Sequence, residues 1–226
     1  HTVSYGAVGA FSAGIGRSEA AAIWATGEIW LKVPTTMKFV FHGKPKPGVT
    51  AKDLMLHLIG KIGADGALYQ SVEFVGEAVD AMTVADRIVL ANMSVEMGGK
   101  NGFFAPDETT FQFLADQGIG RDGYEPVYPD PDAHYESIIE IDASAITPQV
   151  AKPHTVDNVA PVSDVKGTTV HQALIGTCTN GRIEDIRAAV SVLDGRKIAP
   201  GVRLLVFPAS MDIYLQAMKE GLFEPI

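Results

Sequence analysis

The chain has 226 residues, of which 46% are apolar and 20% are charged, a composition typical of an ordinary globular protein. Its formal net charge is −9 and its Lys and Arg residues form no basic stripe, which argues against a nucleic-acid-binding protein. No apolar run reaches the length of a membrane span, and no signal-peptide pattern is visible. A single cysteine excludes an intrachain disulfide framework and fits a reducing compartment, so we expect a cytoplasmic protein.

The first part of the chain is rich in glycine. Four glycines lie between residues 6 and 16, and such a run lets the backbone approach another backbone or a ligand closely. The spacing is not that of the dinucleotide-binding fingerprint. Ser18 can cap a helix, which we expect over residues 19–28.

The middle of the chain alternates predicted strands and helices. Strands are expected over 38–41, 67–76, 102–105 and 137–142, and helices over 51–62, 84–97 and 107–115. Thr50 and Asp53 resemble a capping box at the start of the helix over 51–62. Residues 120–135 contain three prolines and mixed charge, which is typical of a linker.

The last part of the chain shows the clearest pattern. After an extended, proline-rich segment over 147–165, a strand is predicted over 172–177, a helix over 181–194, a strand over 202–207 and a helix from 210. This βαβα unit predicts parallel strands in a layered α/β domain.

Cys178 is the only cysteine, and the pattern places it at the carboxyl end of a strand, just before a helix. In open α/β sheets this is where ligands bind, and a helix N-terminus favours the thiolate. The residues alone leave three interpretations open: a small buried packing residue, a nucleophile, or a ligand of a metal or cluster. No CxxC pair and no second cysteine supports the third interpretation from inside the chain.

Glu73 is the second candidate, because it interrupts an otherwise apolar predicted strand. Val72 and Phe74 share one face of that strand, whereas Glu73 lies on the other. A carboxylate in this position is either a solvated surface group or a site residue that pairs with a histidine.

Five ordered blocks resemble the large, catalytic subunit of the aconitase superfamily, and most of all its isopropylmalate and homoaconitate isomerases. The blocks are "HTVSYGAVGAFSAGIG", "GKIGADGALYQSVEFVG", "NMSVEMGGKNGFFAPDETT", "PHTVDNVAPVSDV" and "IGTCTNGRIEDIRAA". The resemblance spans the whole chain. It implies an α/β fold of layered α/β/α aconitase-like iron–sulfur domains with mostly parallel sheets. Residues 1–34 would end a first subdomain, 35–134 would form a second, and 135–226 would begin a third.

The resemblance also implies a chemistry. Members of the family hold a 4Fe–4S cluster with three cysteines and leave one iron open to the substrate. They act as hydro-lyases on a hydroxy-dicarboxylate, here 2-isopropylmalate in leucine biosynthesis, with homoaconitate or another 2-hydroxy acid as the alternative. Cys178 would be the first cluster ligand and metal-binding residue. His1 would be the motif histidine, and Glu73 its carboxylate partner. The expected partner is a separate small subunit, with no nucleic acid and no membrane.

Several parts of the family pattern are missing, which suggests an internal fragment of a larger subunit. The aspartate and serine before the motif histidine, the CxxC pair and the substrate-binding asparagine and arginines do not occur in their places. We therefore expect the chain alone to be inactive. Two alternatives remain: a truncated module without a cluster, and a hydrolase that uses Cys178 as nucleophile with His1 or His171 as base.

Overall fold

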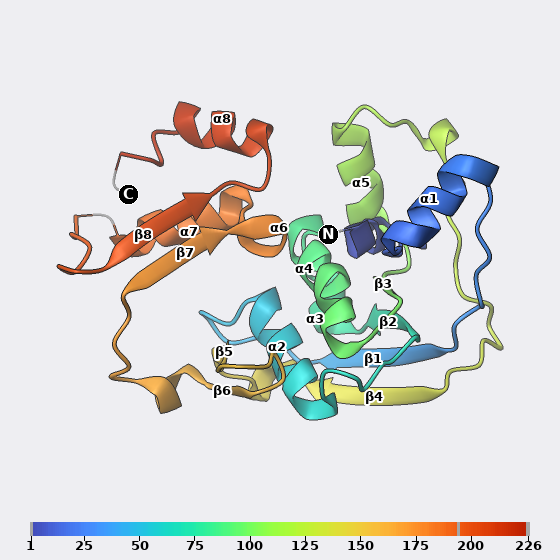
Figure 1. Cartoon of the computed structure of the whole chain (residues 1–226), viewed down its shortest axis with the longest axis horizontal. Coiled ribbons are helices and arrows are strands. Elements are labelled where there is room, and N and C mark those ends of the chain that lie inside the picture. Colours follow the sequence, from blue (N-terminus) through green and yellow to red (C-terminus); the bar gives the residue numbers. More distant parts are fainter. Residues whose placement is uncertain (1, 194, 225–226) are drawn as a thin grey trace. The chain divides into compact units, whose positions relative to one another are not determined.

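The computed structural model describes residues 2–193 and 195–224, which are drawn in Figure 1. The chain divides into two compact units, Thr2–Asp164 and Val165–Ile226. No helix in the described part of the chain is long and apolar enough to cross a membrane.

A four-stranded sheet forms the centre of the first unit. Its strands are β1 (Thr36–His42), β2 (Ser71–Val75), β3 (Asn101–Phe103) and β4 (Ser137–Asp142). They lie in the order β3-β2-β1-β4, and all neighbours are parallel. β1 and β2 are therefore the inner strands, and each has hydrogen-bonded neighbours on both sides.

Helices and short turns complete the first unit. The α-helices are α1 (Arg17–Thr26), α2 (Ala51–Ile62), α3 (Glu77–Asp80), α4 (Val84–Met93) and α5 (Glu108–Asp116). The 3-10 helices are η1 (Thr2–Val8), η2 (Ser94–Met97), η3 (Arg121–Gly123), η4 (Ala143–Ala145) and η5 (Val162–Val165). β5 (Gln149–Ala151) and β6 (Val159–Pro161) form a small antiparallel pair.

The core of this unit lies on one face of the sheet. Phe39 and Phe41 of β1 and Phe74 of β2 are almost completely buried, and they pack in one cluster with apolar residues of α2, α3 and α4. The rings of Phe39 and Phe74 stack with centroids 6.0 Å apart. Because strand residues alternate between faces, Lys38 and Glu73 project from the opposite side of the sheet.

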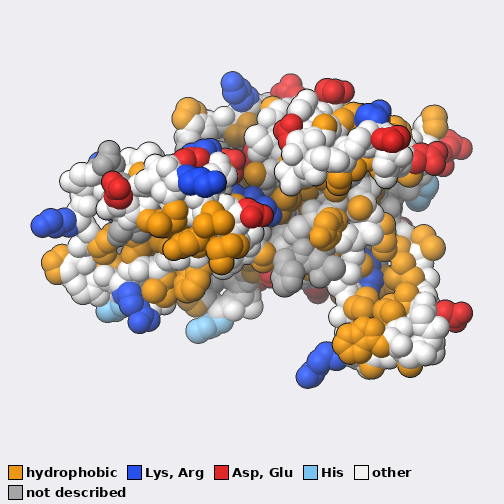
Figure 2. Space-filling view, turned by 90° about the horizontal axis from the view of Figure 1, so that it is seen from above, with side chains coloured by type: hydrophobic (Ala, Val, Ile, Leu, Met, Phe, Trp, Pro, Cys, Tyr) orange, Lys and Arg blue, Asp and Glu red, His pale blue; other side chains and the backbone are white. Residues whose placement is uncertain are grey.

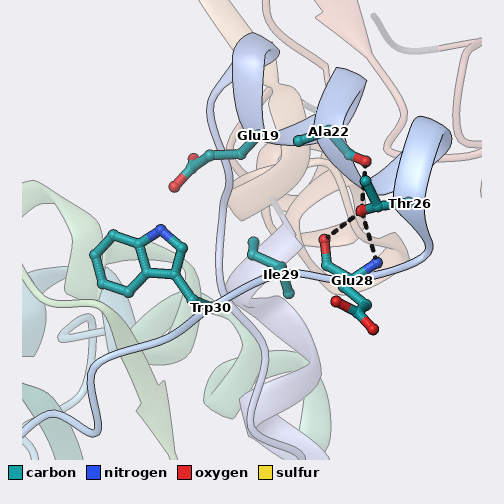
Figure 3. A pocket seen from close by; sticks show the side chains of 6 residues that line it. All are labelled: Glu19, Ala22, Thr26, Glu28, Ile29 and Trp30. Atoms are coloured by element: carbon teal, nitrogen blue, oxygen red, sulfur yellow. Dashed lines mark hydrogen bonds between the residues drawn. The ribbon is translucent and has the colours of Figure 1, made fainter.

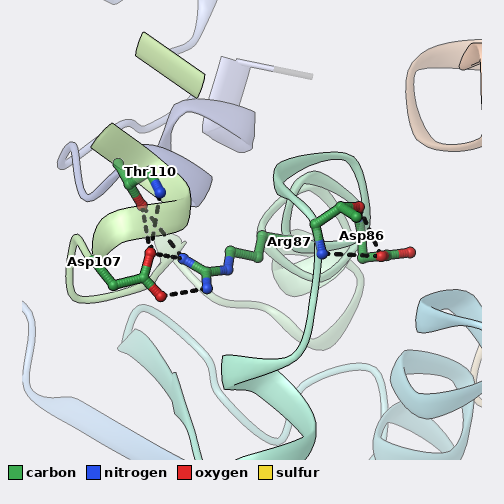
Figure 4. A network of polar contacts seen from close by, with 5 residues as sticks. Asp86, Arg87, Asp107 and Thr110 are labelled. Carbon is green, nitrogen blue, oxygen red and sulfur yellow. Dashed lines mark hydrogen bonds and ion pairs between the residues drawn. The ribbon is translucent and has the colours of Figure 1, made fainter. Parts of the chain in front are cut away.

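An ion pair between a buried arginine and a partly exposed aspartate joins α4 to the start of α5 (Figure 4). Arg87 is 1% exposed and donates hydrogen bonds of 2.8 and 2.5 Å to the two carboxylate oxygens of Asp107. Asp107 also caps α5, since its Oδ1 accepts from the backbone N–H of Thr110 at 3.0 Å. The Arg87 hydrogen bonds outweigh the opposing effect of burial and hold the pKa of Asp107 below its ordinary value.

The second unit is a βαβα arrangement. β7 (Gln172–Gly176) and β8 (Arg203–Phe207) are parallel, and α6 (Thr177–Asn180), α7 (Ile183–Leu193) and α8 (Met211–Lys219) complete it. Ile186 of α7 and Ala217 of α8 are fully buried against each other's helix. Arg187 and Glu220 link the same two helices through two hydrogen bonds.

The structure confirms the predicted α/β fold with mostly parallel strands. The helix over 51–62 and the strand over 137–142 form with the predicted bounds. The glycine-rich start forms η1, where a Cβ on Gly6 would lie 1.7 Å from the carbonyl oxygen of Gly102 in β3. The close backbone approach expected for this segment is therefore present.

Several predicted elements have different bounds, and in three of them a local feature interrupts the expected helix or strand. The helix over 84–97 ends as an α-helix at Met93 and continues as η2 to Met97, where Gly98 ends it with a left-handed φ of 85°. The strand over 67–76 begins only at Ser71, since Tyr69 has φ of 58°. The helix over 181–194 begins at Ile183, after the extra turn α6.

The predicted division at residues 34 and 134 stays a prediction. The strand that begins at Ser137 pairs with β1, so the central sheet contains strands from both sides of the second boundary.

Candidate active site

Glu73 lies on an inner strand of the sheet and is only 1% exposed. It stands beside Lys38 in the β1–β2 register, and Lys38 Nζ lies 3.5 Å from Glu73 Oε2. The Lys38 side chain retains 22% exposure, so it connects the buried carboxylate to the surface of the sheet. The sequence left open whether Glu73 was a solvated surface group, and its burial excludes that interpretation.

Tyr135, two residues before β4, completes a three-residue cluster with Lys38 and Glu73. Lys38 Nζ lies 4.0 Å from the centroid of the Tyr135 ring. Burial and a hydrogen bond with Glu73 raise the pKa of Tyr135. Burial acts to lower the pKa of Lys38, but Tyr135 and Glu73 together outweigh it, and the pKa of Lys38 is raised.

One oxygen of Glu73 keeps hydrogen-bonding capacity. Among the described residues, no group makes a hydrogen bond to Glu73 Oε2, although the ion pair with Lys38 is formed there. An ionised carboxylate offers about four acceptor positions, so a further donor can bind. His1, the predicted partner, lies outside the described residues, and its pairing with Glu73 stays a prediction.

Cys178 lies in α6, two positions after the end of β7, and its side chain is half-buried. The backbone before it is tightly constrained. A Cβ on Gly176 would lie 2.2 Å from the carbonyl oxygen of Phe207, and Gly176 has φ of 146°. Thr177, the next residue, has φ of 76°, which is rare for a β-branched side chain. The cysteine is therefore held at the carboxyl end of a parallel strand, as predicted.

The residues after Cys178 fix the start of α7. A Cβ on Gly181 would lie 2.8 Å from the backbone nitrogen of Ala209, so this loop also packs against the end of β8. Asp185 accepts hydrogen bonds from the Asn180 side chain at 3.1 Å and from the Arg182 backbone N–H at 3.0 Å. The segment containing Cys178 is thus anchored by backbone contact on one side and by the first turn of α7 on the other.

The described residues do not contain a complete site for a metal or cluster. No group of three or more His, Cys, Asp and Glu side chains in the described ranges is arranged to hold a metal ion. The full sequence contains one cysteine, whereas a 4Fe–4S cluster with one open iron takes three. Cys178 can therefore supply one ligand, and the chain's own side chains do not fit the whole group.

A pocket of about 380 Å³ lies beside α1 and the segment that follows it (Figure 3). Glu19, Thr26, Glu28 and Trp30 are among the residues that line it, and neither Glu73 nor Cys178 is. Trp30 is 82% exposed, and none of the α1 residues is buried. Figure 2 shows further hydrophobic side chains gathered on the surface between charged ones. The pocket contains no grouping of acid, base and nucleophile.

Sequence reasoning missed Lys38 and Tyr135. Lys38 was available as the polar residue in the predicted strand over 38–41, but its relation to Glu73 depends on the register of β1 and β2. Tyr135 was assigned to a linker, and only the pairing of β4 with β1 brings it to this face.

Comparisons with known proteins agree with the resemblance. The model of the aconitase family (aconitate hydratase) matches residues 1–169 and 160–226. The chain is 51% identical over 224 residues to the 3-isopropylmalate dehydratase large subunit of Syntrophus aciditrophicus, covering 99% of this chain and 53% of that protein. It is 48% identical over 226 residues to the probable 3-isopropylmalate dehydratase large subunit of Methanothermobacter thermautotrophicus, with 99% and 53% covered.

The chain thus spans about half the length of the curated relatives it matches. The family model covers both units, including the strand with Glu73 and the segment with Cys178. On these grounds the chain belongs to the aconitase family.

Proposed function

We propose that the chain contributes to the large subunit of a 3-isopropylmalate dehydratase. Such an enzyme isomerises 2-isopropylmalate to 3-isopropylmalate by loss and re-addition of water, in the cytoplasm, as a step of leucine biosynthesis. The observation that carries the proposal is 51% identity over 224 residues to a protein named as that large subunit. A separate small subunit and a hydroxy-dicarboxylate substrate are the partners that this role requires.

Cys178 would be one of three cysteine ligands of a 4Fe–4S cluster. When bound, the cluster supplies a Lewis-acidic iron for the substrate hydroxyl and carboxylate. The fixed backbone on both sides of Cys178 supports this role, because a cluster ligand needs a defined position. Since the chain provides one cysteine, no reaction step is assigned to the cluster.

Glu73 would act through the motif histidine, His1. A buried carboxylate that accepts a hydrogen bond from an imidazole fixes the orientation of the ring and favours its protonated form. A histidine held in this way can deliver or remove a proton at the substrate hydroxyl. The burial of Glu73 and the spare capacity of its Oε2 support this assignment.

The domain proposal accompanies this function. We propose that the complete subunit contains three aconitase-like subdomains, to which residues 1–34, 35–134 and 135–226 of this chain belong. In that organisation Glu73 belongs to the second subdomain and Cys178 to the third.

A chimaera tests the proposed function. The 224 residues of the Syntrophus aciditrophicus large subunit that match this chain are replaced by it, and the product is assembled with that enzyme's small subunit. After anaerobic reconstitution with iron and sulfide, we expect turnover of 2-isopropylmalate and little turnover of homoaconitate. A folded chimaera that binds cluster but does not isomerise 2-isopropylmalate, or that prefers homoaconitate, contradicts the proposal.

Single substitutions in the chimaera test the proposed roles of Cys178 and Glu73. Cys178→Ser is expected to lose bound iron, and Glu73→Gln to keep iron but lose turnover. Glu140→Gln is the control, because Glu140 is an exposed carboxylate on β4 of the same sheet. Full activity in Glu73→Gln would remove Glu73 from the catalytic machinery.

A further inference from the structure

We propose that Lys38 is a positioning residue for Glu73: it holds this buried carboxylate in place through an ion pair, with Tyr135 covering the ammonium group. The inference rests on the proposed function, since it assigns a role to a neighbour of the carboxylate used there. Neither the motif blocks nor the predicted strands pointed to Lys38 or Tyr135.

The buried position of Glu73 requires a compensating charge. At 1% exposure an ionised carboxylate is strongly disfavoured unless a cation compensates its charge. Among the described residues, Lys38 is the cation within ion-pair distance, with Nζ 3.5 Å from Oε2. The register of two inner parallel strands fixes the Cα atoms of this pair side by side, so the approach is imposed by the sheet.

The neighbours of Lys38 keep its ammonium group beside Glu73. Its ammonium group lies 4.0 Å over the centroid of the Tyr135 ring, which restricts its escape to solvent. On its other side in the register stands Ile138, which offers no competing charge. The nearest alternative acid on β4, Glu140, lies 3.6 Å from His42 instead.

The ion pair leaves part of the hydrogen-bonding capacity of Glu73 unused. A purely structural ion pair satisfies its buried oxygens, whereas Glu73 Oε2 makes no hydrogen bond with any described residue. Lys38 approaches Oε2 only at ion-pair distance, with Nζ 3.5 Å away, so this oxygen still has room for a further donor. Glu73 is therefore held where it can accept a hydrogen bond from a proton-carrying group.

Competitive amine labelling of the 226-residue chain tests the contact directly. The chain is labelled with trace acetic anhydride over a series of pH values, and the modification of each lysine is read by mass spectrometry. In Glu73→Gln the charge that favours the ammonium form is lost while burial remains, so the labelling midpoint of Lys38 should move to lower pH. Tyr135→Phe should move the midpoint in the same direction.

Two controls make this result specific. Lys100, which lies 5.4 Å over the ring of Tyr69, serves as the internal reference and should label identically in every variant. Glu140→Gln should leave Lys38 unchanged, because that carboxylate pairs with His42. An unchanged Lys38 midpoint in both Glu73→Gln and Tyr135→Phe overturns the proposal, whatever the activity of the protein.

Kinetics of the chimaera test the positioning role. Lys38→Met should lower kcat by about tenfold or more with little change in KM, since acid–base contributions commonly exceed tenfold. Lys38→Arg should restore most of the rate, and Lys100→Met should be neutral.

The outcomes separate the two proposals. If Lys38→Met matches the unsubstituted chimaera in both kcat and KM, the positioning role is wrong while the proposed function stands. If no chimaera has activity but labelling behaves as expected, the Lys38–Glu73 contact stands and the proposed function fails.

Discussion

Arg87 and Asp107, twenty positions apart, form a bidentate ion pair that connects α4 to the N-terminus of α5. Arg87 is 1% exposed, whereas the Asp107 side chain keeps 40% exposure. The pair therefore places a buried cation against a carboxylate that reaches the surface. The first two predictions follow from this asymmetry.

Asp107→Ala should destabilise the first unit strongly, because it leaves the Arg87 guanidinium buried without its partner. Asp107 also caps α5, so the loss combines an unpaired buried guanidinium with a missing helix cap, and we expect about 2 kcal/mol. Urea unfolding followed by circular dichroism measures the loss. Arg187→Ala, which breaks the exposed pair with Glu220 in the second unit, is the control and should have a much smaller effect. Equal effects of the two substitutions would contradict the assignment.

The same pair makes stability depend on pH. The pKa of Asp107 is lowered in the folded protein by its hydrogen bonds with Arg87, so the pair's contribution is fully present above the unfolded value of about 3.9. It is lost as the pH falls through the lower, folded pKa. The stability advantage of the unsubstituted chain over Asp107→Asn should be constant near neutrality and shrink below about pH 4. If the stability difference between the unsubstituted chain and Asp107→Asn does not change below about pH 4, Asp107 is not the titrating group.

Gly176→Ala should disrupt the segment that holds Cys178. The added Cβ would lie 2.2 Å from the Phe207 carbonyl oxygen, at a φ of 146° that L side chains rarely adopt. We expect a lower melting temperature of the second unit and faster reaction of Cys178 with a thiol reagent. Gly14→Ala is the control, since nothing lies within 4 Å of a Cβ there. Unchanged melting and labelling in Gly176→Ala would rule out the tight contact.

Cys178 should react with a thiol reagent in the native chain, because its side chain is half-buried and not enclosed in the core. The rate is measured without and with denaturant, and Cys178→Ser provides the blank. A thiol that stays unreactive until the chain unfolds would favour the interpretation of a buried packing residue.

The 226-residue chain alone should bind no stable 4Fe–4S cluster and show no dehydratase activity. One thiolate does not replace three, and no group of three ligands occurs among the described residues. Anaerobic reconstitution followed by iron analysis and visible absorption is the measurement. Near-stoichiometric cluster, or turnover of isopropylmalate without additions, would refute this expectation.

Local sequence determined several elements of the fold. α2 forms with its predicted bounds because Thr50 and Asp53 make a complete capping box, in which the Thr50 N–H donates to Asp53 Oδ2 at 2.7 Å. Its apolar stripe is buried as expected, including Leu54 and Leu58. The motif blocks, which are also local, identified the family. Such features depend on residues a few positions apart, and the sequence alone therefore determines them.

Only the tertiary structure decided the relationships between distant residues. Lys38 meets Glu73 because β1 and β2 pair in one register, and a shift by a single residue would place the two side chains on opposite faces. Arg87 meets Asp107 because α4 packs against the start of α5, a contact that no periodicity within either helix specifies. Strand order, register and helix packing result from burying one shared core, and the environment of Glu73 is set by that packing rather than by its neighbours in sequence.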